Sequence, residues 1–279
     1  MKLALARKLA FIATSTSAIL IVALACRAAE SRSPIVAAHA ADVSLQHHEI
    51  KLTDLPAPYA TRSAGNPPRV ASQPAGAVLH VPRGFSVSLY ASGFNDPRNM
   101  ILAPNGDVIV ADTAAGNIII LRGEKKYTFA SELNEPYGLA IHDRWLYIGD
   151  QDAIVRLPYT PGETRSNAQP QRIAPLPPGG HSTRGVVFNR AGTKMYVSVG
   201  SASNVSAGEP AERAAILEMN PDGTAKRIFA SGLRNPVGMA WNPETGALWT
   251  AVNERDGLGD DLVPDYATEV RAGAFYGWP

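Results

Sequence analysis

The sequence of 279 residues contains one cysteine, Cys26, close to the N-terminus. With no second cysteine, no disulfide can form within the chain, even in an oxidising compartment that would permit one. The long stretch beyond Cys26 therefore holds neither a catalytic thiolate nor a cysteine-based zinc site. Any catalytic site there must use other side chains.

A surplus of charge is also missing. The 26 basic and 25 acidic residues are interspersed and leave a formal charge of +1, so the electrostatic footprint of a nucleic-acid binder is absent. Hydrophobic residues make up 45% and charged residues 18% of the chain, which suits a globular core and exceeds what a disordered chain would carry. DNA and RNA are therefore not expected as partners.

The N-terminus holds a long apolar stretch. Lys2, Arg7 and Lys8 precede apolar residues 9–25, and small-residue sites follow at 23–25 and 38–40. This is the layout of a secretory signal peptide, which we assign to residues 1–40, and it predicts a periplasmic or secreted protein. Two alternatives stay open: residues 9–25 as an uncleaved membrane anchor, and lipidation at Cys26, although Ala23 stands where a lipoprotein usually has leucine.

Residues 41–80 are rich in proline, alanine, serine and glycine, lack a sustained period, and are interpreted as an extended lead-in. Residues 81–279 repeat one template of a strand, a tight turn with Asn, Asp or Gly, and a second strand rich in Val, Ile, Tyr and Trp. The template covers residues 100–112, 138–150, 185–200 and 238–253.

Two further short strand candidates follow each of the first three repeats. They lie at residues 117–121 and 127–131, 153–157 and 171–175, and 215–219 and 226–230. Four short strands per repeat, with almost no helical periodicity, predict an all-β protein of the six-bladed β-propeller family, here an incomplete propeller of about four blades. A β-sandwich is the alternative, but it does not explain why the same turn residues recur at the same positions of each repeat.

The strand count leaves two irregularities. Residues 85–91 have the pattern of an outermost strand whose blade is not present upstream, and the last repeat ends soon after a third strand near residues 268–271. Because a propeller protects its strand edges by closing into a ring, the sequence predicts a C-terminally truncated propeller that folds poorly on its own.

Polar residues gather at one end of the predicted blades. The first two strands of a blade run antiparallel, so residues before the first strand and after the second lie at the same end of the channel. His181 stands out, because the other repeats carry a proline in its slot. Arg98, Asn99, His181, Arg184, Arg234 and Asn235 precede first strands, and Asp112, Asp150, Ser201, Glu254, Arg255 and Asp256 follow second strands. Such a rim predicts a polar, anionic ligand.

Three segments of the chain resemble a known family. Residues 231–240 (SGLRNPVGMA), 253–261 (NERDGLGDD) and 275–279 (FYGWP) are similar to the pyrroloquinoline quinone (PQQ) dependent soluble sugar dehydrogenases, the glucose and sorbosone dehydrogenases. The resemblance extends from about residue 81 to the end, and the spelling of the second segment is closer to the sorbosone branch.

The resemblance implies a role for each matching residue. His181 would be the general base, and Arg234, Asn235, Glu254 and Arg255 would bind PQQ. The main-chain carbonyls of Asp256 and Gly257 would hold Ca²⁺. The chain departs from the family in three places: Ser201 stands where an aspartate orients the histidine, Arg255 replaces a glutamine, and Asp256-Gly257 replaces a Gly-Pro pair.

The implied activity is oxidation of sugars or sugar aldehydes by hydride transfer to PQQ, followed by electron transfer to a respiratory cytochrome or quinone. A membrane partner is expected only through Cys26 lipidation or an uncleaved signal. Two alternatives remain: a calcium-dependent sugar lactonase that uses Glu254 with nearby Asn and Asp residues as ligands, and a propeller that only binds.

Overall fold

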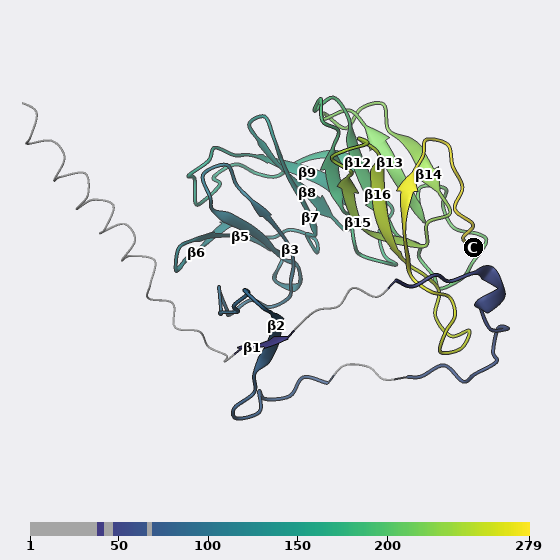
Figure 1. The fold of residues 1–279 in the computed structure, drawn as a ribbon. Helices are drawn as coiled ribbons and strands as arrows, with labels where there is room; N and C mark the ends of the chain where they lie inside the picture. Colours follow the sequence, from purple (N-terminus) through teal and green to yellow (C-terminus); the bar gives the residue numbers. More distant parts are fainter. Residues whose placement is uncertain (1–37, 42–46, 66–68) are drawn as a thin grey trace, which may run out of the picture. The chain divides into compact units, whose positions relative to one another are not determined.

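The computed structural model describes residues 38–41, 47–65 and 69–279 (Figure 1). Cys26 and the apolar stretch 9–25 lie outside the described residues, as do the first 37 residues of the expected signal peptide. Regular structure in the described part is almost entirely β. It includes no helix with the length and apolar character to cross a membrane.

The chain divides into two compact units, and the described residues of the first are 38–41, 47–48 and 69–92. It contains a parallel pair of strands, β1 (Ala38–Ala41) and β2 (Leu79–Pro82). Residues 85–91 form no strand, so the prediction of an orphan outer strand was wrong. An alternating sequence becomes a strand only where a neighbouring edge satisfies its N–H and C=O groups. Here the alternate residues Phe85 and Leu89 are 70% and 52% exposed instead.

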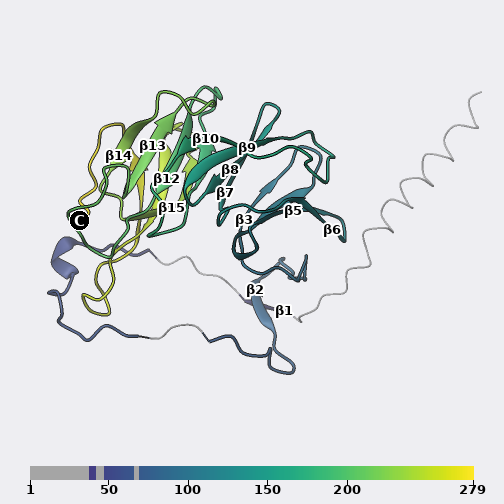
Figure 2. The same cartoon turned by 180° about the vertical axis from the view of Figure 1, so that it is seen from behind.

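The second unit, residues 49–67 and 93–279, holds four antiparallel sheets in sequence order, which we call blades I to IV (Figures 1 and 2). Blade I comprises β3 (Pro97–Leu102), β4 (Val108–Asp112), β5 (Asn117–Arg122) and β6 (Lys125–Ala130). Blade II comprises β7 (Gly138–His142), β8 (Trp145–Asp150), β9 (Ala153–Pro158) and β10 (Gln171–Pro175). Blade III comprises β11 (Val186–Phe188), β12 (Met195–Val199), β13 (Ala215–Met219) and β14 (Arg227–Ser231). Blade IV comprises β15 (Asn235–Trp241), β16 (Leu248–Asn253) and β17 (Tyr266–Val270). The predicted incomplete propeller of four blades is confirmed.

Two short 3₁₀ turns complete the unit, η1 (Leu52–Asp54) and η2 (Thr113–Ala115). The segment around η1 runs along the loop between β16 and β17. Tyr59 N–H donates to Leu258 O at 2.6 Å, and Ala64 N–H donates to the Asp260 carboxylate at 2.8 Å. Part of the expected lead-in is thus bonded to blade IV.

The blades pack face to face because side chains alternate along each strand. On β8, Leu146 and Ile148 join the core shared with blade I, whereas Tyr147 between them joins the core shared with blade III. A third core between blades III and IV includes Tyr196 and Val252. Blades II and III are therefore covered on both faces by these cores.

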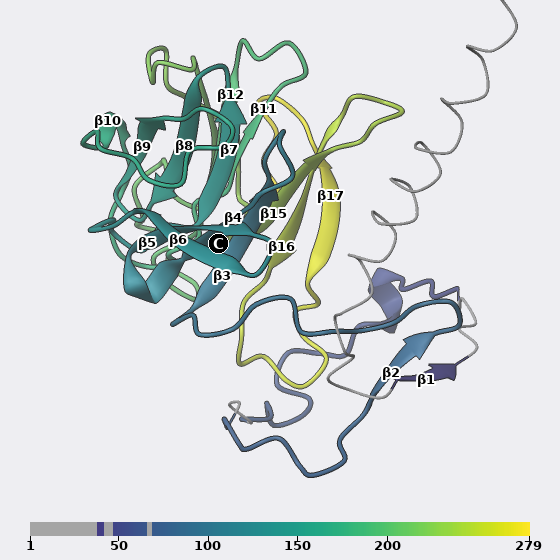
Figure 3. The same cartoon turned by 90° about the vertical axis from the view of Figure 1, so that its left-hand side faces the viewer.

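Strand pairing places the predicted rim at one end of the blades. Pro97 pairs with Asp112 in blade I, and Asn235 pairs with Asn253 in blade IV. The starts of the innermost strands and the ends of the second strands therefore lie together, as antiparallel pairing requires. The first strands of neighbouring blades, β11 and β15, contact each other. Figure 3 shows β16 and β17 of blade IV side by side.

Blades II and III come unusually close where the main chain of Arg184 crosses β7 and β8. A Cβ placed on Gly138 or on Gly149 would lie 2.1 Å from Arg184 O, which no side chain tolerates. Arg184 itself is fully buried. Glycine at these two paired positions is what allows the loop before β11 to reach its place.

Gly149→Ala should therefore destabilise the fold by about 1–3 kcal/mol, because the added methyl group must displace main-chain atoms of Arg184. Gly238→Ala is the matched control, since Gly238 also lies within a strand but its Cβ would meet open space. Urea unfolding of both variants measures the difference. Equal stabilities would contradict the close approach.

Candidate functional site

His181 is held by one main-chain oxygen. Its N–H donates to Ser201 O at 3.0 Å, and its ring Nδ1 lies 2.8 Å from the same oxygen. A carbonyl oxygen only accepts hydrogen bonds, so Nδ1 must carry the proton. In the neutral imidazole, Nε2 then keeps its lone pair, and the described residues place no hydrogen-bond donor or acceptor on it. The half-buried ring therefore has one unprotonated nitrogen, Nε2.

The Ser201 side chain completes this contact. Its Oγ lies 3.1 Å from His181 Nδ1 and donates to Ser203 O at 2.7 Å. The sequence comparison put Ser201 at the position of an orienting aspartate, and the structure does place it against the ring. The group that orients the ring is mainly the main-chain carbonyl of Ser201. The residue type at a position does not reveal such a main-chain role. No carboxylate is needed to select the tautomer.

The side chains of Asn235 and His181 both lie against Gly200. A Cβ on Gly200 would lie 2.5 Å from Asn235 Oδ1 and 2.7 Å from His181 Cβ, so both side chains press on the bare Cα. Asn235 Oδ1 accepts from Thr183 Oγ1 at 2.9 Å. In the described part of the chain, nothing accepts from Asn235 Nδ2. The structure therefore brings together the predicted base and one predicted cofactor residue.

Arg234 contributes its main chain to this cluster and turns its side chain away. Its carbonyl accepts from Ser201 N at 2.7 Å. All five guanidinium N–H groups have partners: the carbonyls of Asn204, Asn253 and Glu254, and the side chains of Asn204 and Asp256. The cofactor-binding role of Arg234 stays a prediction, and in this structure the guanidinium ties two loops together.

Asn204 is a residue that the sequence analysis missed. Its amide makes a reciprocal pair with the main chain of Asp256: Nδ2 donates to Asp256 O, and Oδ1 accepts from Asp256 N, both at 2.8 Å. Asn204 O also accepts from Trp278 Nε1 at 3.0 Å. The only available signal was an asparagine in the long loop between β12 and β13, and nothing in the repeat template marks it.

The predicted Ca²⁺ site at the main-chain carbonyls of Asp256 and Gly257 stays a prediction. The Asp256 carboxylate pairs with Arg234 at 3.0 Å, and its carbonyl oxygen is already bonded to Asn204. The described residues contain no group of three or more His, Cys, Asp or Glu side chains that would hold a metal ion. Ca²⁺ also binds main-chain and asparagine carbonyl oxygens, so this finding decides neither the calcium site nor the ligand set of the lactonase alternative.

Glu254 and Arg255 lie just beyond Asn253, the register partner of Asn235. Glu254 is buried, with its carboxylate 3.9 Å from Arg255 Nε, and that Nε is buried without a hydrogen-bond partner in the described structure. PQQ carries carboxylates and quinone oxygens that need N–H donors. Asn235 Nδ2 has no acceptor among the described residues, and the Arg255 side chain has only its ion pair with Glu254. These two residues are therefore the N–H donors that would hold such a group.

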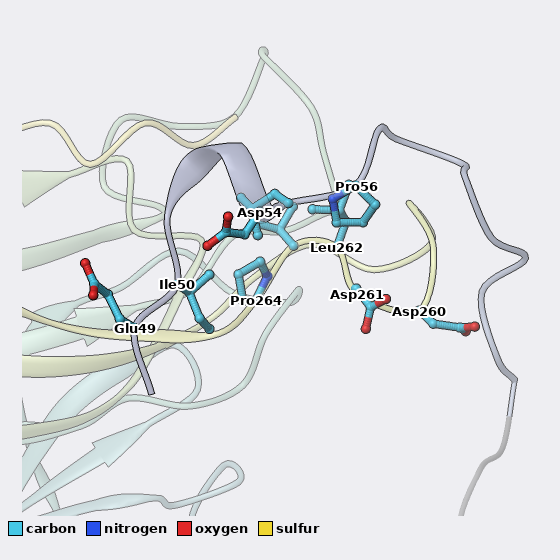
Figure 4. A pocket seen from close by; sticks show the side chains of 10 residues that line it. Glu49, Ile50, Asp54, Pro56, Asp260, Asp261, Leu262 and Pro264 are labelled. Carbon is cyan, nitrogen blue, oxygen red and sulfur yellow. The ribbon is translucent and has the colours of Figure 1, made fainter. Parts of the chain in front are cut away.

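A separate cavity of about 500 Å³ lies between residues 49–56 and the loop 260–264 (Figure 4). Figure 4 shows four carboxylates around it, from Glu49, Asp54, Asp260 and Asp261. Asp260 is used structurally, because it accepts from Ala64 N and its own N–H donates to Thr61 Oγ1. The acidic loop anchors the lead-in segment.

Five charged residues of the predicted rim are buried: Asp112, Asp150, Arg184, Arg234 and Glu254. Burial shifts the pKa of two of them, Arg184 and Asp150, far from its usual value. Arg184 bonds the carbonyls of Pro177, His181 and Thr183, and burial lowers its pKa to about 10, with the Arg213 guanidinium adding to the effect. Burial raises the pKa of Asp150 to about 7, and Asp150 Oδ1 has no partner in the described residues. Both side chains belong to the scaffold.

Solved structures share this architecture. The iodide structure of the family AA12 enzyme of Trichoderma reesei is 20% identical, with a TM-score of 0.62 over 68% of this chain and 57% of that one. The holo PQQ domain of pyranose dehydrogenase from Coprinopsis cinerea is 19% identical, with a TM-score of 0.60 over 69% and 55%. The PQQ-bound aldose sugar dehydrogenase of Streptomyces coelicolor is 22% identical, with a TM-score of 0.56 over 68% and 64%. The fold is thus the β-propeller seen in sugar-oxidising quinoproteins.

The family follows from the sequence match. Residues 79–268 match the TrAA12-like family, and the chain belongs to it. An uncharacterized protein of Borreliella burgdorferi is 27% identical over 208 residues, which are 70% of this chain and 55% of that protein. The chain therefore spans little more than half the length of this relative and of the Trichoderma enzyme.

Asp150 makes stability depend on pH. Its folded pKa of about 7 lies above the unfolded value of 3.8, so its contribution is full below pH 4 and is lost as the pH rises through 7. A shift of about three units corresponds to at most about 4 kcal/mol. We expect Asp150→Asn to exceed the wild type in stability at pH 8 by up to about this amount and to match it near pH 4.

Denaturant unfolding across this pH range is the measurement. Asp143→Asn is the control, because the Asp143 side chain is 78% exposed and asparagine tolerates its left-handed backbone. The explanation fails if Asp150→Asn and the wild type lose stability in parallel from pH 4 to pH 8.

Proposed function

We propose that this protein oxidises sugars or sugar aldehydes, with PQQ as the hydride acceptor and His181 as the general base. The observation that carries the proposal is the Nδ1–H tautomer of His181, because it presents an unprotonated Nε2 in a site that also offers N–H donors with no hydrogen-bond acceptor among the described residues. The names of the structures with this fold, which include PQQ-bound sugar dehydrogenases, support the same reading.

Each residue of the site has its own role in the proposed reaction. His181 Nε2 removes the proton from the hydroxyl of a lactol or hydrated aldehyde while the hydride leaves the carbon that carries this hydroxyl. The carbonyl of Ser201 stabilises the resulting imidazolium through Nδ1–H. Asn235 and Arg255 donate to anionic oxygens. PQQ, when bound, supplies the two-electron acceptor.

The proposal extends to the cellular setting. We infer export to the periplasm or outside the cell from the N-terminal pattern of basic residues followed by an apolar stretch. Electrons would then pass to a respiratory cytochrome or quinone. Sorbosone-like aldehydes and glucose are the substrates to test first.

His181→Ala should lower kcat by about 10²- to 10⁴-fold, the usual contribution of a positioned base, and leave PQQ affinity nearly unchanged. The assay adds PQQ and Ca²⁺ to the purified chain, follows dye reduction with glucose and sorbosone, and measures PQQ binding by absorbance titration. His47→Ala is the control, because His47 is exposed and outside the blades.

A folded wild-type protein that binds no PQQ would contradict the proposal. Hydrolysis of a sugar lactone without PQQ would instead favour the lactonase. Full turnover by His181→Ala would remove His181 from the mechanism and leave the oxidoreductase assignment intact.

A further inference from the structure

Arg213 lies in the loop before β13 and is almost completely buried. Its guanidinium reaches four main-chain carbonyls. NH1 donates to Gly200 O at 3.0 Å, and NH2 lies 2.5–3.0 Å from the carbonyls of Pro177, Pro178 and Gly179. No carboxylate of the described residues forms an ion pair with it, so these carbonyls are its main electrostatic partners.

The four carbonyls belong to the two segments that determine the orientation of His181. Residues 177–179 lead directly into His181, and Gly200 precedes Ser201, whose carbonyl holds Nδ1. Gly180 lies close to both Ser201 and Arg213, since a Cβ on Gly180 would be 2.7 Å from Ser201 O and 2.8 Å from Arg213 NH1. One guanidinium thus sets the spacing across which the His181–Ser201 contact forms.

Arg184 braces the same loop from the other side. Its NH1 donates to His181 O at 2.6 Å, and its NH2 shares Pro177 O with Arg213. Two neighbouring buried cations are costly, and burial with mutual repulsion lowers the pKa of Arg184 to about 10. Because both cations are placed at the His181 loop despite this cost, we infer that they hold the loop in position.

We propose that Arg213 is a positioning residue for the catalytic base: it clamps residues 177–179 to Gly200 and thereby keeps His181 Nδ1–H on the Ser201 carbonyl, with Nε2 free to accept a proton. The role of His181 as a base rests on the proposed function. The clamp and the tautomer do not.

Arg213→Lys tests the clamp, because a lysine retains the charge but its single nitrogen cannot span carbonyls on both segments as a planar guanidinium does. We expect kcat to fall about 10- to 100-fold with KM within about twofold, as for a misplaced catalytic group. The ring ¹⁵N spectrum of His181 should show the Nε2–H tautomer emerging in the variant. Arg122→Lys is the control, since Arg122 pairs with Asp107 in blade I, away from this loop.

The ¹⁵N spectrum separates the two proposals, since it needs neither PQQ nor turnover. An unchanged His181 tautomer in folded Arg213→Lys overturns the positioning role, whatever the activity. If Arg213→Lys does not fold, Arg213→Gln replaces it with the same readouts. Failure of both variants to fold would assign Arg213 to general stability and overturn the proposal as well. Wild-type protein that binds no PQQ but shows the tautomer shift in the variant would overturn only the proposed function.

Discussion

The carbonyl of Ser201 accepts two hydrogen bonds from His181, one from the main chain and one from the ring. An oxygen with two lone pairs and no proton leaves the ring a single neutral tautomer. The rest of the site depends on this contact. Gly200 lets Asn235 and His181 approach each other, and Ser201 N donates to the carbonyl of Arg234, so blades III and IV meet beside His181.

Two buried arginines hold the loops that form the contact between His181 and Ser201. Arg184 and Arg213 are bound to carbonyl oxygens, with no ion-paired carboxylate among the described residues. Buried cations seldom improve stability compared with apolar side chains of similar size, so their presence is better explained by what they position. The close glycine contacts at Gly138 and Gly149 serve the same loop. Stability and site geometry are thus linked at the junction of blades II and III.

The blades could be predicted because a period of two with turn residues at fixed offsets is a local property of the chain. The 85–91 segment carried the same local signal and formed no strand, since a strand also needs a neighbouring edge. The meeting of His181 with Asn235 followed from the repeat alignment. The partners of Arg234 did not, because Asn204 lies 30 positions away in an irregular loop. The orienting role of Ser201 could be anticipated from its slot, but its use of a main-chain oxygen could not.

The most direct test of this account is the ¹⁵N chemical shifts of the two ring nitrogens of His181 in the wild-type protein, at a pH where the imidazole is neutral. The account predicts a protonated Nδ1 and an unprotonated Nε2. A protonated Nε2 would contradict it, because the nitrogen assigned to accept the substrate proton would already carry one.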